Sequence, residues 1–207
     1  MDNCTSVLYI TMAKKSERTR QRIVEAANRL FYHQGYNRTS FSDVVEAANV
    51  PRGNIYYYFK TKDEILEAAI KHRTERIAQM LEGWTGSYRT PIDRLHRFID
   101  ILSNSADAIM RYGCPMGTLN TELGKDQGAL QEQAENLFKV FESWLSDQFA
   151  ELGYAGRAHE LALRLMAQGQ GISVMAHVHN DPGFLRREKE RLALWLDKLA
   201  DGDDDCA

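Results

Sequence analysis

The sequence predicts an all-α protein of nine helices. Apolar residues recur at spacings of three and four along most of the chain, which is the period of a helix with one buried face. No stretch alternates apolar and polar residues with the β-branched enrichment of a strand. Prolines occur only where a helix would begin or a turn would lie, at Pro51, Pro91, Pro115 and Pro182. We therefore expect no sheet.

The composition is that of an ordinary globular protein. Of the 207 residues, 43% are hydrophobic and 27% are charged, which excludes wholesale disorder and low-complexity classes. No apolar run is long enough to span a membrane, and the apolar N-terminal run has no basic residues before it, so we expect neither a membrane span nor a signal peptide. Three scattered cysteines, Cys4, Cys114 and Cys206, are typical of a reduced cytoplasmic protein.

The expected helices are spread over the whole chain. Their approximate ranges are 15–34, 41–48, 52–59, 63–81, 90–112, 115–123, 126–152, 156–179 and 183–200. In the first helix, Ile23, Ala26 and Leu30 belong to one apolar stripe, and Gly35 ends the helix.

Two short helices joined by a tight turn predict a helix-turn-helix. Ser40 is the expected cap of the helix 41–48, with Asp43 three residues further on as a weaker form of the capping box. Asn49 tolerates the left-handed backbone of the turn, and Pro51 can open the next helix.

The charge distribution separates an N-terminal head from the rest of the chain. Residues 13–62 hold ten basic and four acidic residues, a net charge of +6, whereas the remainder carries −9. A basic segment on an acidic body favours a polyanion as the partner of that segment.

The helix 52–59 has the properties of a helix that reads DNA. A recognition helix must enter a major groove about 12 Å wide and present hydrogen-bonding side chains. Ile55 and Phe59 can hold the helix on its neighbours, while Arg52 and Asn54 can reach bases or phosphates. Tyr56, Tyr57 and Tyr58 spread over too wide an arc to be buried together, and their hydroxyls can donate to phosphates. The alternative for a single tyrosine, Tyr57 above all, is that it covers the core.

The segment TRQRIVEAANRLFYHQGYNRTSFSDVVEAANVPRGNIYYYFKTKDEIL resembles the DNA-binding domain of the TetR family of transcriptional regulators. Two positions depart from the family pattern, since Asn49 stands where glycine is usual and Tyr58 where histidine is common. The resemblance implies an all-α homodimer that binds a palindromic double-stranded DNA operator and a small effector. The DNA contacts that it implies are Ser40, Ser42, Arg52, Gly53, Asn54, Tyr56, Tyr57, Tyr58 and Lys62.

The resemblance also divides the chain. Residues 1–14 are expected to be a flexible segment, 15–61 the helix-turn-helix domain, 62–200 the helical domain for effector binding and dimerisation, and 201–207 an acidic tail.

The body is expected to hold the effector site. Its segment RYGCPMGTLNTEL resembles one that opens a central pocket helix in a subgroup of the family. Large flexible or aromatic side chains suit a pliable site for an apolar or aromatic molecule. The candidates are Met110, Tyr112, Met116, Phe138, Phe141, Trp144, Met166, Met175 and His177. The alternative for each of them is a place in the plain core.

The last two long helices are expected to form the dimer interface, as the resemblance implies. Each carries an apolar stripe suited to helix packing. The predicted contacts are Ala162, Leu165, Gly169, Ile172, Leu192, Trp195 and Leu199. The alternative is that both stripes face the core of their own subunit.

We predict a repressor that a small-molecule inducer releases from its operator. The alternative trigger is oxidation of Cys114, although a cysteine in this place is more often a small buried apolar residue. His177 and His179 point about 200° apart on a helix and cannot share a metal. The pair Gly169 and Gly171 lacks the third glycine and the strand of a dinucleotide loop. We therefore expect no metal, no cofactor and no enzyme activity, and the basic head argues against a purely structural helical protein.

Overall fold

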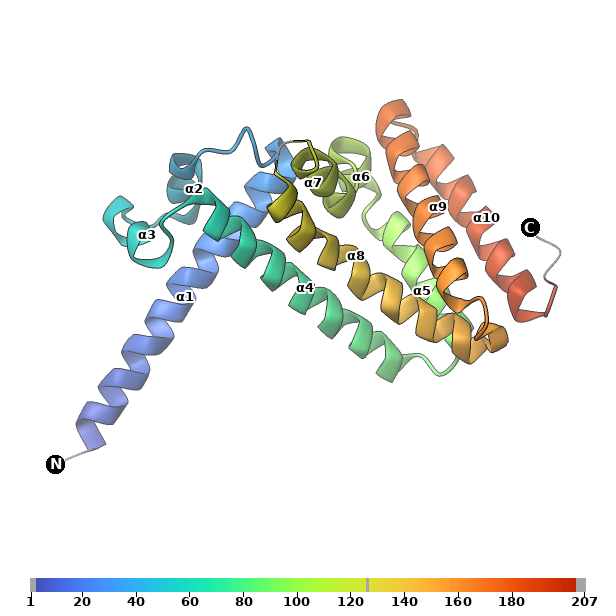
Figure 1. The fold of residues 1–207 in the computed structure, drawn as a ribbon, viewed down its shortest axis with the longest axis horizontal. Helices are drawn as coiled ribbons and strands as arrows, with labels where there is room; N and C mark the ends of the chain where they lie inside the picture. The colour runs from blue at the N-terminus through green and yellow to red at the C-terminus, as the bar shows by residue number, and fades with distance from the viewer. Residues whose placement is uncertain (1–2, 126, 204–207) are drawn as a thin grey trace. The chain divides into compact units, whose positions relative to one another are not determined.

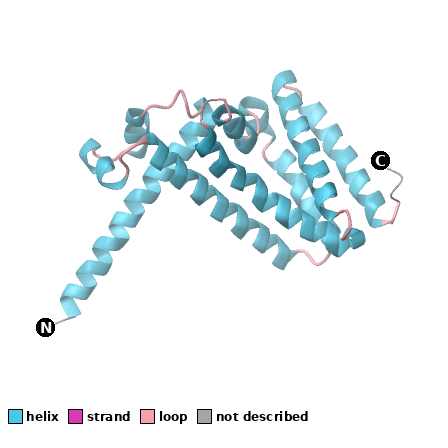
Figure 2. Ribbon diagram, in the orientation of Figure 1, coloured by secondary structure: helices cyan, strands magenta, loops and turns pink. Residues whose placement is uncertain are grey.

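The computed structural model describes residues 3–125 and 127–203. Within these ranges the chain is helical with no strand, which confirms the all-α fold class (Figures 1 and 2). The helices are α1 (Asn3–Gln34), α2 (Phe41–Ala48), α3 (Arg52–Tyr58), α4 (Lys62–Ser87), α5 (Pro91–Asn104), α6 (Ala106–Tyr112), α7 (Pro115–Leu123), α8 (Gly128–Phe149), the π-helical turn η1 (Ala150–Tyr154), α9 (Ala158–His179) and α10 (Pro182–Ala200). No described helix is long and apolar enough to cross a membrane.

The helix expected over about 90–112 is divided into α5 and α6. Ser105 ends α5 with φ −115° and ψ 16°, outside the helical range, and α6 begins at the next residue. The described chain therefore holds ten α-helices where nine were expected.

The chain forms two compact units. The first comprises the described residues up to Arg73 together with those of Glu122–Gln133, and the second comprises Thr74–Thr121 with the described residues from Ala134 onwards. The division differs from the expected boundary after residue 61, because the start of α4 buries apolar side chains within the first unit. These are Ile65, Leu66, Ala69 and Ile70.

In the first unit, α1 packs against α2. Most of the stripe expected on α1 is buried, with Ile23, Ala26 and Ala27 fully inaccessible, while Leu30 is half-buried. The helix begins at Asn3, whereas the sequence predicted its start near residue 15. It ends at Gly35, whose φ of +88° is readily adopted by glycine.

In the second unit, α10 packs against α5 and α9, and α9 packs against α6. One apolar core joins these helices to the C-terminal half of α8, and its fully buried members include Leu95, Leu145, Phe149, Leu165 and Leu196. Thr90 caps α5 by accepting a hydrogen bond from the backbone N–H of Asp93, and Asp181 caps α10 in the same way from Gly183.

Candidate DNA-binding site

Local side-chain chemistry shapes the start and end of α2. The Ser40 hydroxyl accepts a hydrogen bond from the Asp43 backbone N–H at 3.1 Å, and the Ser40 backbone N–H donates to the Asp43 carboxylate at 2.8 Å. This reciprocal pair confirms the expected capping box. Asn49 ends the helix in the left-handed region, at φ 49° and ψ 49°, as the turn required.

A side chain from α1 holds the same turn. The guanidinium of Arg22 donates to the carbonyl oxygens of Ala48 and Asn49 at 2.8 and 2.9 Å. These carbonyls end α2 and have no partner within that helix, so Arg22 supplies one and ties the turn to α1. The sequence contained no signal for this contact, because the two carbonyls are 26 and 27 residues away.

The helix α3 is anchored by one face and exposed on the other. Ile55 and Phe59 are buried, as predicted, at 0% and 3% exposure. Arg52, Gly53 and Asn54 are exposed at the start of the helix. The arrangement leaves the polar face of α3 free to approach a groove.

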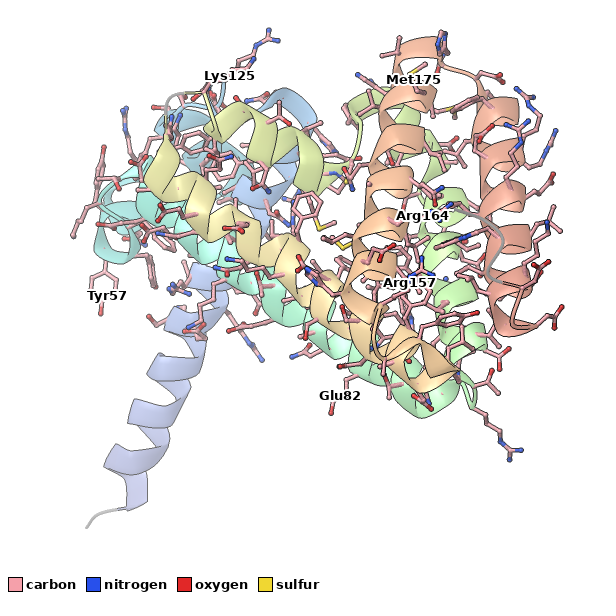
Figure 3. All side chains as sticks on the ribbon, turned by 45° about the vertical axis from the view of Figure 1, so that its right-hand side comes forward. Tyr57, Glu82, Lys125, Arg157, Arg164 and Met175 are labelled. Atoms are coloured by element: carbon pink, nitrogen blue, oxygen red, sulfur yellow. The ribbon has the colours of Figure 1, made fainter. Side chains whose placement is uncertain are left out.

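The three tyrosines have different surroundings. Tyr57 is 76% exposed and its side chain stands away from the helices, so it does not cover the core (Figure 3). Tyr56 is 46% exposed and stacks on Phe41 with ring centroids 5.1 Å apart. Tyr58 is half-buried, and its hydroxyl accepts a hydrogen bond from Ser16 of α1 at 3.3 Å. Tyr57 is therefore the most exposed of the three residues.

Of the contacts predicted around α2, Ser42 lies near the start of α3. Ser40 and Ser42 are both exposed. The Arg52 guanidinium donates to the Ser42 hydroxyl at 3.4 Å, so one residue from each helix of the pair meets across the turn. Both remain predictions as DNA contacts.

Lys62 is held by the turn that follows α1. Its ammonium donates to the Tyr36 carbonyl oxygen at 2.9 Å and lies 4.0 Å from the centre of the Tyr36 ring. Burial lowers the pKa of Lys62, while Asp63 and Glu122 oppose that shift. The structure thus gives Lys62 a structural partner in the first unit, and its predicted contact with DNA stays a prediction.

Tyr36 is the centre of this cluster. It is 1% exposed and its hydroxyl is hydrogen-bonded to the Asp63 carboxylate. Burial, followed by the Asp63 hydrogen bond and the charges of Asp63 and Glu122, raises the pKa of the Tyr36 phenol.

The predicted effector residues of the second unit divide into buried and exposed sets. Phe141 and Met166 are buried in the core, while Met116, Phe138 and Trp144 are half-buried against it. The Trp144 indole N–H donates to the Thr85 hydroxyl at 2.9 Å, and its ring meets Trp84 edge to face.

Four other effector candidates lie around α6 and α9. His177 Nδ1 lies 2.8 Å from the Met110 carbonyl oxygen, so these two residues are brought together. Met175 is exposed on α9 (Figure 3). His177 is exposed on the same helix, and exposure argues against an interior lining role for both residues. Tyr112 is half-buried.

The stripe predicted for the dimer interface faces the core of its own unit. Six of its seven members are at most 8% exposed, namely Ala162, Leu165, Ile172, Leu192, Trp195 and Leu199. Side chains already buried there are not available to a second chain, so this prediction is corrected. Gly169 is half-buried.

A second set of apolar side chains on the same helices is exposed. Leu163, Val174, Met175 and Val178 of α9 are 43–66% exposed, and Leu194 of α10 is 63% exposed. We call these five residues the outer apolar face. The sequence contained this signal, because positions 163, 174 and 178 also follow a helical period, whereas the predicted stripe of α9 is rich in small residues suited to close helix approach.

The anchored α2–α3 pair, with a polar face exposed on its second helix, defines a helix-turn-helix DNA-binding protein. Comparison with known proteins agrees. The family model described as bacterial regulatory proteins, tetR family, matches residues 23–69. A second model, described as the C-terminal domain of LmrA/YxaF-like transcriptional regulators, matches residues 91–191.

Relatives match most of the chain. An uncharacterised helix-turn-helix-type transcriptional regulator of Lactococcus lactis subsp. lactis is 27% identical over 187 residues, covering 88% of this chain and 95% of its own. The transcriptional regulator LmrA of Bacillus subtilis is 26% identical over 156 residues, covering 74% of this chain and 83% of its own. A crystal structure of a TetR transcriptional regulator from Legionella pneumophila has 25% identity and a TM-score of 0.74, covering 86% of this chain and 95% of its own.

The chain belongs to the TetR family of bacterial regulatory proteins. It is a DNA-binding transcriptional regulator and not an enzyme.

Proposed function

We propose that the protein is a cytoplasmic repressor that binds a palindromic operator as a homodimer and leaves it when a small molecule binds. The observation that carries the DNA-binding part is the exposed start of α3, where Arg52, Gly53 and Asn54 stand on a helix anchored by Ile55 and Phe59. Arginine and asparagine are side chains that read guanine and adenine edges in the major groove.

We infer dimerisation because one short recognition helix contacts too few base pairs to specify an operator. A single recognition helix contacts a few base pairs, and two-fold symmetry places two of them on half-sites about 34–36 Å apart. The outer apolar face supports a partner at α9 and α10, because five large apolar side chains on two adjacent helices are exposed. A second copy of the chain would bury them in an isologous contact.

The inducer is proposed to bind in the second unit. Its half-buried Met116, Phe138 and Trp144 lie against the apolar core, and such side chains suit an apolar or aromatic molecule. A displacement of a few ångströms between the two recognition helices would spoil simultaneous docking on both half-sites.

Selection from random duplex DNA tests this function. The expected result is an enriched inverted repeat whose half-site centres lie about one or two helical turns apart. Binding should weaken steeply with salt, because Lys and Arg release counterions from phosphates. A panel of aromatic, quaternary-ammonium and acyl compounds is then screened for release from the selected duplex. An enriched sequence without two-fold symmetry would contradict the dimeric reading.

A thiol trigger is the second candidate. Cys114 is half-buried just before α7, and its sulfur accepts a hydrogen bond from the Gln170 side-chain amide of α9 at 3.4 Å. Oxidation of this sulfur would change a contact between α7 and α9. Operator affinity is measured with and without peroxide for wild type and Cys114→Ser. The thiol trigger predicts that peroxide weakens binding in wild type alone, and equal responses of both proteins would exclude it.

A further inference from the structure

The turn that leaves α1 is held by a carboxylate from the distant end of α7. After Gly35, the backbone N–H groups of Tyr36 and Asn37 point to one side, and both donate to Glu122. The Tyr36 N–H lies 2.9 Å from one oxygen and the Asn37 N–H lies 2.8 Å from the other. Both oxygens of Glu122 are therefore used in binding one turn of the DNA-binding unit, in charge-assisted hydrogen bonds.

The carboxylate lies close against the backbone. A Cβ atom added at Gly35 would lie 3.1 Å from each Glu122 oxygen, tighter than most real contacts. Glycine at this position therefore serves the close approach of the carboxylate as well as the positive φ.

The same turn is held from the side of α4. Lys62 donates to the Tyr36 carbonyl oxygen, and Asp63 binds the Tyr36 hydroxyl. Next to Glu122, the side-chain amide of Gln127 donates to the Asn37 side-chain oxygen at 3.1 Å. The end of α1, the start of α4 and the α7–α8 corner thus meet at Tyr36 and Asn37, and removing the corner leaves the turn held from one side.

The helix α7 connects this contact to the second unit. Residues 115–121 of α7 belong to the second unit, whereas Glu122 belongs to the first. Near the end of α7, the Asn120 side-chain amide donates to the Ala134 carbonyl oxygen of α8 at 3.2 Å. Glu122 lies within the nine-residue helix α7, and a shift of α7 by about 1 Å would take a 2.9 Å hydrogen bond beyond useful length.

We propose that Glu122 is the positioning residue through which α7 controls operator binding: its carboxylate holds the α1–α2 turn in the arrangement that docks α3. The proposal rests on the proposed DNA-binding function. It names the residue that carries a displacement of α7 to the reading helices, and it requires neither the inducer nor the dimer interface to be known.

The main test replaces the carboxylate by its amide. Glu122→Gln keeps the shape but offers one acceptor oxygen in place of two, whereas Glu122→Asp keeps the charge on a shorter side chain. Glu132→Gln is the matched control, because Glu132 is exposed on α8 within the same unit. Each full-length protein is assayed for affinity to the selected duplex and to unrelated duplex DNA, for thermal unfolding, and for hydrogen exchange at the Tyr36 and Asn37 amides.

A positioning role predicts a specific pattern. Glu122→Gln should weaken binding to the selected duplex about tenfold, a usual size for coupling between sites, and leave binding to unrelated DNA within about twofold. The Tyr36 and Asn37 amides should exchange faster than in wild type. The affinity of Glu122→Asp for the selected duplex should fall between those of wild type and Glu122→Gln. This variant keeps the test valid if Glu122→Gln unfolds. Glu132→Gln should match wild type.

A double-mutant cycle tests the route through α7. Asn120→Ala removes the bond to Ala134 and should weaken specific binding a few-fold, but it should add nothing in the Glu122→Gln background. Additive losses would show that α7 acts by another route. Two results for Glu122→Gln would overturn the proposal. One is faster exchange at the Tyr36 and Asn37 amides with unchanged affinity for the selected duplex. The other is unchanged exchange at these amides. If wild type bound no duplex at all, the proposed function itself would fail, which is a distinct result.

Discussion

A charge placed on the outer apolar face should separate the two subunits of the proposed homodimer. Val178 is 66% exposed on α9 and Leu194 is 63% exposed on α10, so a partner would cover most of each side chain. Complete burial of such a side chain is worth about 1.5–3 kcal/mol, so covering the exposed two-thirds is worth about 1–2 kcal/mol. In a two-fold interface each residue is counted twice, which gives about 2–4 kcal/mol per substituted position.

The variant Val178→Glu loses this term and also buries two carboxylates without partners. Even partly solvated, the unpaired charges add about 1–3 kcal/mol, so the total is on the order of 3–7 kcal/mol. Since each 1.4 kcal/mol is about tenfold, the dimer dissociation constant should rise by at least about a hundredfold.

The measurement is sedimentation equilibrium across the micromolar range, with operator binding in parallel. Gln131→Glu is the control, because it adds the same charge at an exposed position of α8 in the first unit. Val178→Glu should be folded and monomeric, and should bind the operator only at high concentration. If Val178→Glu stays dimeric while Ile172→Glu dissociates as a folded monomer, the stripe first predicted from the sequence is the interface and the reasoning from exposure is wrong.

Three further outcomes are expected. Arg52→Ala should weaken operator binding by about 1–3 kcal/mol and relax the sequence preference at one base pair. Competition between single-base variants of the duplex measures this preference. A uniform loss of affinity over all duplexes would instead identify Arg52 as a phosphate contact. Arg22→Ala should lower the free energy of unfolding, measured in urea, by about 1–2 kcal/mol, a value that already allows for the exposure of Arg22. Arg29→Ala on the same helix should change it little. Equal losses of stability in the two variants would show that the contact between Arg22 and the turn has no special role. Because the pKa of the Tyr36 phenol is raised in the folded state, the unfolded chain loses the phenol proton first, and stability should fall as the pH rises above about 10. Tyr36→Phe should flatten this pH dependence of stability. An unchanged slope in Tyr36→Phe would contradict this assignment to Tyr36.

The local structure of the N-terminal helix-turn-helix could be predicted from the sequence, because it depends on interactions between neighbouring residues. The capping box at Ser40 and Asp43, the left-handed Asn49 and the buried Ile55 each follow from residues no more than a few positions apart. The same holds for the end of α1 at Gly35, where a positive φ was required. Interactions at this range depend on residue type and spacing alone, so they could be predicted without knowing what packs where.

Contacts between distant segments were not readable in this way. Arg22 reaches carbonyls 26 and 27 residues away, and Glu122 reaches amides 86 and 85 residues away. An arginine or a glutamate on a helix surface is ordinary in sequence, because nothing local distinguishes a solvated charge from one that binds a turn. The division of the chain at Arg73, with 122–133 joined to the head, depends on the same long-range contacts.

By itself the sequence determined the helical fold, the helix-turn-helix and its outward polar helix, since period, caps and turn residues act over a few positions. The tertiary structure decided which stripe of α9 is buried. Leu165 and Ile172 lie in the core, whereas Val174 and Val178 are exposed, although all four are apolar and helically spaced. Only the packing of α6 and α10 against α9 distinguishes the two faces, because burial belongs to a pair of surfaces and not to one amphipathic pattern.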